Sequence, residues 1–168
     1  MAASIGIHGL RPSPALESIT DTMYQNFNLQ IDKAVSTGNS SHLDKPMEDY
    51  VKLMEVAPNH LSYLVEKGSF YSVLTKYVSQ GQYDSVIAFM HEFLEKPNSE
   101  VFITDEVLLC FAACQLAIDP LAYHDICAQL IQETLQEYPE FYQHFDALML
   151  SDPAFTEFYR PLAQFFKQ

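Results

Sequence analysis

Residues Thr104–Ile118 read TDEVLLCFAACQLAI, and after the two acidic residues that follow the threonine only Gln115 is polar. A helix that is apolar around nearly its whole circumference has no face to expose to water, so other helices must surround it. Its alanines leave room for neighbouring backbones to approach closely. About fifteen residues are too few to span a bilayer, which takes about twenty. This stretch therefore predicts the central helix of a helical domain.

The segments on both sides of this stretch carry apolar residues at helical spacing, and none shows sustained strand alternation. Asp119-Pro120 follows it directly, with aspartate as the cap of the next helix and proline at its first position. The apolar residues of that next helix are Leu121, Tyr123, Ile126, Cys127, Leu130, Ile131 and Leu135. We predict an all-α fold, a compact bundle of about eight helices in antiparallel hairpins, similar to an α-solenoid.

Composition indicates one folded domain after a short arm. The chain of 168 residues is 48% hydrophobic and has only five glycines, which is typical of a globular protein. Residues 1–13 lack helical periodicity, so we predict a flexible N-terminal arm there and a single α-helical domain over residues 14–168. The three cysteines do not form a secreted disulfide pattern, and the N-terminus lacks the features of a signal peptide. We therefore expect a cytoplasmic protein.

One hairpin resembles a known repeat. Gly81, Tyr83 and Pro97 stand where the second helix of a tetratricopeptide repeat has its glycine turn, its aromatic residue and its closing proline. Residues 67–99 are thus similar to one hairpin of that family. Larger side chains replace the family's small residues at three positions: Leu74, Val86 and Phe93.

The resemblance also implies a ligand-binding face. In this family the inner side of the first helix contacts the bound peptide, and the matching residues here are Tyr71, Thr75 and Ser79. We expect these three side chains to contact a partner if the hairpin functions as the family's hairpins do.

Negative charge is concentrated in the second half of the chain. The formal net charge is −13, and no lysine or arginine occurs between residues 97 and 159. This half would repel nucleic acid, which is bound by neutralising its phosphates with basic side chains, and it would also repel an anionic membrane surface. The same field would attract a basic protein or peptide. Solubility alone is the other explanation of the acidity.

The last part of the chain, from Tyr138 to Gln168, is rich in aromatic residues. Two short helices can bury only part of this ring surface, and exposed aromatic side chains are typical contacts for a partner. Each residue could also belong to the core, or to a homodimer interface. The candidate partner-binding residues are Phe141, Tyr142, Phe145, Phe155, Phe158 and Tyr159.

Four residues offer an alternative metal site. Cys110 and Cys114 lie one helical turn apart, and His124 and Cys127 lie about one turn apart on the following helix. If the two helices fold back on each other, these side chains could hold a structural zinc ion. The other interpretation is that the cysteines are small buried apolar residues. We predict no cofactor.

These patterns favour a binding protein over an enzyme. No glycine-rich phosphate loop or nucleophile elbow occurs in the sequence, and we expect no enzymatic activity. The leading hypothesis is a protein–protein interaction module that binds a protein or peptide of basic character. One alternative is a small acidic chaperone or adaptor for a client or a secreted effector. A further alternative is a helical metal-binding protein or enzyme that uses His91, His124 or His144.

Overall fold

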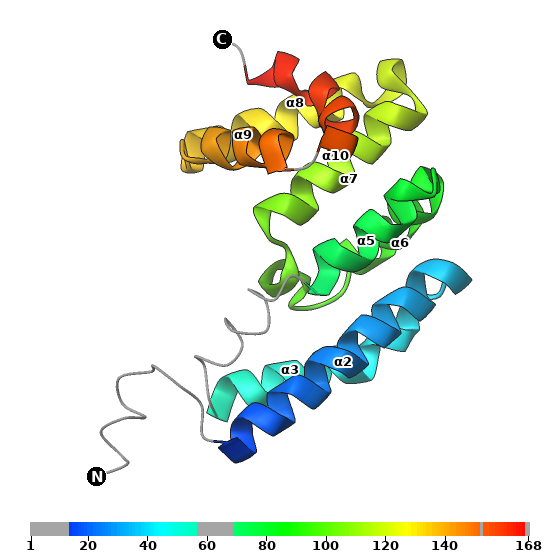
Figure 1. Cartoon of the computed structure of the whole chain (residues 1–168), viewed down its shortest axis with the longest axis vertical. Helices are drawn as coiled ribbons and strands as arrows, with labels where there is room; N and C mark the ends of the chain where they lie inside the picture. The colour runs from blue at the N-terminus through cyan, green and yellow to red at the C-terminus, as the bar shows by residue number, and fades with distance from the viewer. Residues whose placement is uncertain (1–13, 57–68, 152, 167–168) are drawn as a thin grey trace. The chain divides into compact units, whose positions relative to one another are not determined.

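The computed structural model describes residues 14–56, 69–151 and 153–166, and every regular element within these ranges is helical (Figure 1). The predicted all-α fold is confirmed. The α-helices are α2 (Pro14–Thr37), α3 (Asp44–Val56), α5 (Ser69–Ser79), α6 (Tyr83–Leu94), α7 (Asp105–Ile118), α8 (Pro120–Glu137), α9 (Phe141–Ser151) and α10 (Pro153–Tyr159). The 3-10 helices are η1 (Ser40–Leu43), η2 (Ser99–Phe102) and η3 (Arg160–Phe165). The predicted arm at residues 1–13 lies outside the described ranges.

Contacts divide the chain into two compact units, residues 1–73 and 74–168, with the boundary inside α5. A single α-helical domain over residues 14–168 stays a prediction. Each unit buries aromatic side chains of its own, such as Phe27 and Tyr50 in the first and Phe93 and Phe141 in the second. Each unit therefore has its own apolar cluster.

In the first unit, α2, η1 and α3 pack against one another. The ring of Phe27 lies edge-on to that of Tyr50, with centroids 4.9 Å apart, and edge-on to that of Phe70 at 5.7 Å. Such pairs add a specific geometry to the burial of apolar area. The side chain of Asn39 accepts the N–H of Ser41 at 3.1 Å and begins η1.

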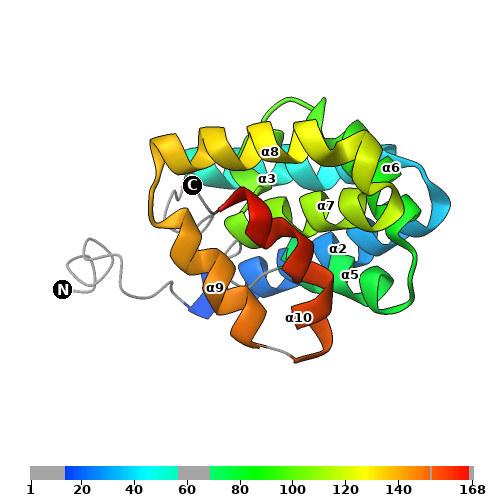
Figure 2. The same ribbon diagram turned by 90° about the horizontal axis from the view of Figure 1, so that it is seen from above.

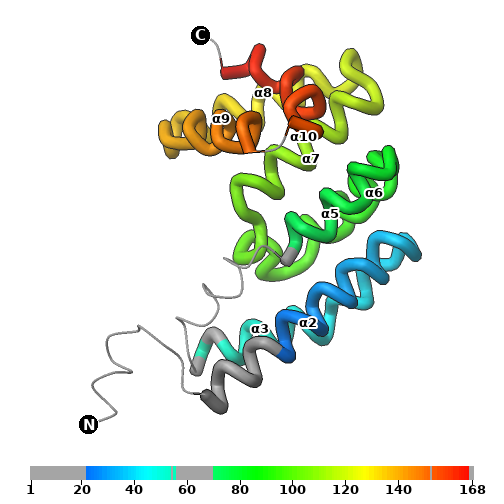
Figure 3. Tube along the Cα trace, viewed as in Figure 1, coloured from blue at the N-terminus to red at the C-terminus, as the bar shows by residue number. Residues whose placement is uncertain are grey.

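In the second unit, α7 lies at the centre, as the sequence predicts. It contacts α6, α8, α9, α10 and η3, and the chain path in Figures 1 and 3 shows these helices on several sides of it. Every residue from Leu109 to Leu116 is buried. Thr104 caps the helix, and its Oγ1 accepts the N–H of Val107 at 3.3 Å. Only the last residues of α7, Ala117 and Ile118, are well exposed.

A single residue joins α7 to α8. The N–H of Asp119 donates to the carbonyl of Gln115 at 3.0 Å and so ends α7. The side chain of Asp119 accepts the N–H of Ala122 at 3.1 Å, and Pro120 takes the first position of α8. Because one residue ends one helix and caps the next, the two helices form the predicted hairpin.

Gly81 lies in the turn between α5 and α6, at the position that the resemblance to a tetratricopeptide hairpin assigns to it. Its φ of +74° lies in the left-handed region, which glycine adopts without steric cost. Its N–H donates to the carbonyl of Val78 at 2.9 Å. The three residues that replace small ones of the family, Leu74, Val86 and Phe93, are fully buried. Tetratricopeptide-like packing of helix pairs stays a prediction.

Candidate functional site

Large apolar side chains exposed to solvent concentrate at the junction of α7 and α8. In the described ranges seven large apolar residues are exposed, and three of them are Ile118, Leu121 and Ile126. Leu121 is the most accessible of the seven, with 92% of its surface exposed. Single exposed apolar residues are ordinary on a protein surface, so these three mark a candidate surface only together with the charges around them.

An exposed ridge of side chains runs along α8. Successive residues four apart are offset by about 40° around a helix, so such a row winds slowly about the axis, and these rows are the ridges by which helices pack. On α8 the row consists of Leu121, Asp125, Gln129, Glu133 and Glu137, all exposed. Ala122 and Ile126 belong to the adjacent row and are exposed too. We call these seven residues the α8 outer face.

The opposite side of α8 packs into the second unit. Cys127 and Ile131 are buried, and the Sγ of Cys127 lies 3.5 Å from the carbonyl oxygen of Ala112 on α7. The side-chain amide of Gln132 donates to the carbonyl of Phe165 at 2.7 Å. Figure 2 shows α7, α9 and η3 on the same side of α8. These contacts fix which side of α8 faces away from the unit.

The α8 outer face is acidic. Its three carboxylates, Asp125, Glu133 and Glu137, belong to the part of the chain that has no lysine or arginine. The side-chain amide of Gln129 donates to Glu133 at 3.0 Å, which joins two members of the ridge. His124 lies next to the face, with its Nδ1 3.2 Å from Asp125 Oδ1. This surface therefore combines apolar side chains with negative charge.

A second polar group connects α7, the end of α8 and α9. Asp105, in the first turn of α7, accepts a hydrogen bond from the hydroxyl of Tyr138 at 3.0 Å. The same carboxylate oxygen lies 2.6 Å from Nδ1 of His144 on α9. Tyr138 is the residue at which α8 ends. Since a carboxylate is also favoured in the first turn of a helix, the group links the start of α7 to the end of α8 and to α9.

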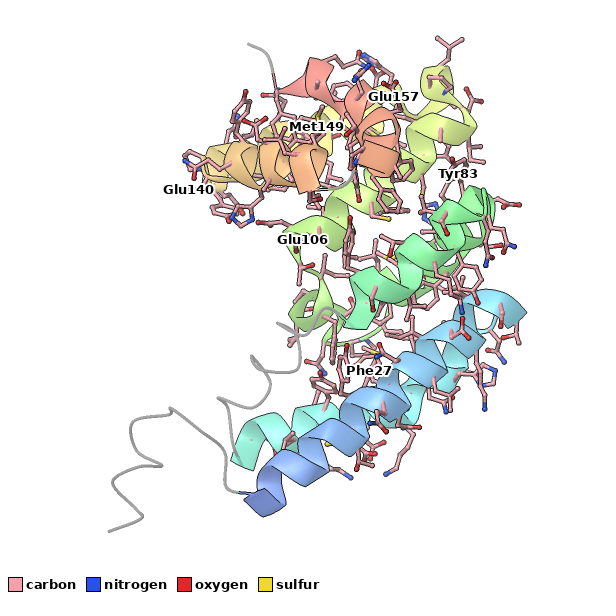
Figure 4. All side chains as sticks on the ribbon, viewed as in Figure 1. Phe27, Tyr83, Glu106, Glu140, Met149 and Glu157 are labelled. Atoms are coloured by element: carbon pink, nitrogen blue, oxygen red, sulfur yellow. The ribbon has the colours of Figure 1, made fainter. Side chains whose placement is uncertain are left out.

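The surroundings of this link are acidic. The pKa of the Tyr138 phenol is raised. The largest cause is desolvation, and the hydrogen bond to Asp105 and the negative charge of Asp105 add to it. Figure 4 shows Glu106 on α7 and Glu140 just before α9 on the same side of the second unit, and both contribute to the rise. A phenol with a raised pKa keeps its proton and donates it in a hydrogen bond. We interpret the group as a link between helix ends.

The structure does not assemble the alternative zinc site. Cys110, Cys114 and Cys127 are fully buried, whereas His124 is exposed and its ring lies against that of Phe165, with centroids 5.1 Å apart. A hydrogen bond with Cys110, together with burial, raises the pKa of the Cys114 thiol. Within the described ranges, no group of three or more His, Cys, Asp and Glu side chains could hold a metal ion. The cysteines therefore serve as small apolar residues of the core.

Because the thiol of Cys127 is buried, we expect the protein to lose stability at alkaline pH. Burial raises the pKa of its thiol to about 11, above the value of about 8.5–9 in an unfolded chain. The folded state holds this proton more tightly, so the stabilisation is present below about pH 9 and is lost as the pH rises through about 11. We expect the ionisation of this one thiol to lower the free energy of unfolding by about 2–3 kcal/mol over that window. Denaturant titrations across this range would measure it.

The matched control for that measurement is Cys127→Ala, which removes the titrating group from the same position. Its free energy of unfolding should depend less steeply on pH between about 9 and about 11, because every other group titrates as before. Equal slopes in the two proteins would show that the thiol of Cys127 is not the group responsible.

Part of the predicted aromatic surface is core. Phe141, Phe145 and Tyr159 are buried, and the ring of Phe145 stacks on that of Phe166 with centroids 4.4 Å apart. Buried rings cannot contact a partner in this fold, so the structure corrects the prediction for these three residues. The reason is that α9 folds against α7, α8 and α10, which supplies the covering that two isolated short helices would lack.

The other three predicted aromatic residues keep accessible surface. Tyr142 is exposed, and Phe155 and Phe158 are half-buried. Tyr83 at the start of α6, labelled in Figure 4, stacks on Phe158 of α10 with ring centroids 5.7 Å apart. Tyr142, Phe155 and Phe158 stay predicted partner-binding residues.

The resemblance to a tetratricopeptide hairpin implies a ligand-binding role for Tyr71, Thr75 and Ser79. They lie along one side of α5, since they are spaced four apart. Tyr71 and Thr75 are half-buried. Ser79 is exposed, and its hydroxyl donates to the carbonyl of Lys76 at 2.7 Å. Their role in binding a ligand stays a prediction.

The sequence pattern predicts that Leu121 and Ile126 belong to the apolar side of α8, but both are exposed in the structure. Their angular position around the helix axis distinguishes these two residues from the buried ones. Relative to Cys127, Leu121 lies about 120° around the helix and Ile126 about 100° in the other direction, at 100° per residue. Ile131 lies within about 40° of Cys127 and is buried with it. A helical wheel centred on Cys127 would have identified the exposed pair.

Comparisons with known proteins give no match to the chain, whether with protein-family models, with curated protein sequences or with solved structures. None of the described helices combines the length and the apolar character needed to cross a membrane.

Proposed function

We propose that this chain is a protein–protein interaction module that binds a basic segment of a partner protein through an acidic and apolar helical surface. The observation that carries the proposal is the α8 outer face, where Leu121 and Ile126 are exposed beside three carboxylates. Apolar side chains supply contact area that releases water, and the negative field steers a positive partner and rejects a negative one.

The charge distribution supports a protein partner over a nucleic acid. Eleven carboxylates and no lysine or arginine lie between residues 97 and 159, and phosphates would meet only repulsion there. Tyr142, Phe155 and Phe158 provide further accessible aromatic surface in the same unit. Aromatic side chains are enriched in protein interfaces because they bury a large area at a small entropic cost.

A salt titration tests the proposal. We expect the purified chain to bind a lysine-rich amphipathic peptide, with an affinity that falls about tenfold or more between about 0.05 M and 0.5 M NaCl, because salt screens attraction between exposed charges. Fluorescence anisotropy of the labelled peptide would measure the dissociation constants.

The control peptide has glutamate in place of every lysine and the same apolar residues. It should bind much more weakly at low salt, because its charges repel the carboxylates of the chain. A dissociation constant that does not change with salt, or equal dissociation constants for the two peptides, would contradict the electrostatic basis of the proposed function.

A further inference from the structure

We propose that the α8 outer face is the docking surface and that its occupant is an amphipathic helix whose lysine or arginine residues are spaced four apart. This inference rests on the proposed function and specifies where the partner binds and what form it takes. Three observations carry it: the ridge geometry of α8, the placement of its exposed apolar residues, and its charge.

The ridge favours a helical occupant. Leu121, Asp125, Gln129, Glu133 and Glu137 form one continuous row of residues four apart over a helix of 18 residues. At 1.5 Å per residue the helix is about 27 Å long, enough for several turns of a partner helix. Helices pack by fitting such ridges into the grooves of the neighbour, and the commonest class uses rows of this spacing.

The exposed apolar residues lie on either side of the centre of the acidic row. Leu121 and Ile126 are separated by about 140° around the helix axis, and Asp125 and Gln129 lie between them. A helix laid over the acidic centre would therefore have an apolar contact on each side. Leu121 and Ile126 are 92% and 55% exposed, so both have area to lose on binding.

The charge selects a basic partner and disfavours a second copy of this chain. Asp125, Glu133 and Glu137 are the only Asp, Glu, Lys or Arg residues of α8. Two outer faces of the same kind would bring carboxylates opposite carboxylates, which is repulsive. Lysine or arginine at a spacing of four would instead place positive charges along the acidic row.

The test compares two pairs of charge reversals with identical net charge. Glu133→Lys with Glu137→Lys alters the α8 outer face, whereas Glu95→Lys with Glu100→Lys alters exposed residues at the end of α6 and in η2. The probe is the lysine-rich amphipathic peptide, titrated at about 0.15 M salt, where screening acts over about 8 Å. We expect the α8 pair to weaken binding about tenfold or more, and the control pair to weaken it less than about threefold.

A second comparison tests the apolar edge of the same face. Ile126→Ser removes an exposed apolar residue of α8, and Leu29→Ser removes one of α2 that is 51% exposed. We expect the first change to weaken binding about fivefold and the second to leave it unchanged, because only Ile126 belongs to the docking surface. Both positions are exposed, so the variants should keep the helical circular dichroism of the parent chain.

The outcomes separate this inference from the proposed function. If the parent chain does not bind the lysine-rich peptide, the proposed function fails and the docking surface fails with it. If the parent chain binds but the α8 variants behave like their controls, the α8 outer face is not the docking surface, and the proposed function still stands. Tight binding of a scrambled peptide with the same composition would overturn the requirement for a helix with lysines four apart.

Discussion

Replacing Leu109 with alanine is expected to lower the free energy of unfolding by about 3–5 kcal/mol. Leu109 lies in the middle of α7 and is 1% exposed. Helices contact α7 on several sides, so neighbouring side chains cannot all move into the space that the leucine leaves. The cost combines the lost transfer free energy of the side chain with that of the remaining cavity. Urea denaturation followed by circular dichroism would measure it.

The chain offers a matched control in Leu121→Ala, the same substitution at the exposed start of α8. We expect a change within about 0.5 kcal/mol, because Leu121 gives up almost no contact with the rest of the chain when it is shortened. A similar loss for the two variants would mean that α7 is not enclosed by its neighbours, and the central position of α7 would then be wrong.

The second prediction concerns two adjacent aromatic residues with different environments. Phe141→Ala should lower the free energy of unfolding by about 3–5 kcal/mol, since deleting a buried ring is among the costliest core changes. Phe141 is fully buried, and its ring lies 5.6 Å from that of Phe166 and 6.4 Å from that of Tyr138, centroid to centroid. The change therefore leaves a cavity between α9 and the ring of Phe166.

The neighbouring variant Tyr142→Ala should cost about 1 kcal/mol or less, because this ring is 47% exposed. Its effect should be seen instead in the affinity for the lysine-rich peptide if Tyr142 contributes to partner binding, as we predict. Thermal melts and anisotropy titrations of both variants would separate the two roles. A large loss of stability for Tyr142→Ala with none for Phe141→Ala would reverse the assignment of core and surface.

Several features of the fold could be predicted because the residues that cause them are close in sequence. Thr104 caps α7 through the N–H of Val107, three residues later. Asp119 and Pro120 lie next to each other and together set the start of α8. The positive φ of Gly81 is also a local property. Caps and turns of this kind depend on a few neighbouring residues, so a sequence pattern is enough to identify them.

Parts of the site depend on residues that are distant in sequence. Asp105 and His144 lie in different helices, and only the packing of α9 against α7 brings them within 2.6 Å. Likewise, Leu121 and Ile126 are as apolar as Ile131, but only the direction in which α8 faces α7 exposes the first two. The division at residues 73 and 74 also depends on contacts throughout the chain.

By itself, the sequence determined that the chain is helical, that Thr104–Ile118 forms an enclosed helix, and that the second half is acidic, because periodicity, capping and charge belong to the residues themselves. The tertiary structure alone decided which apolar residues stay in contact with water. Burial depends on what lies opposite a side chain, and that neighbour comes from another part of the chain. For this reason Phe141 became core while Leu121 became surface.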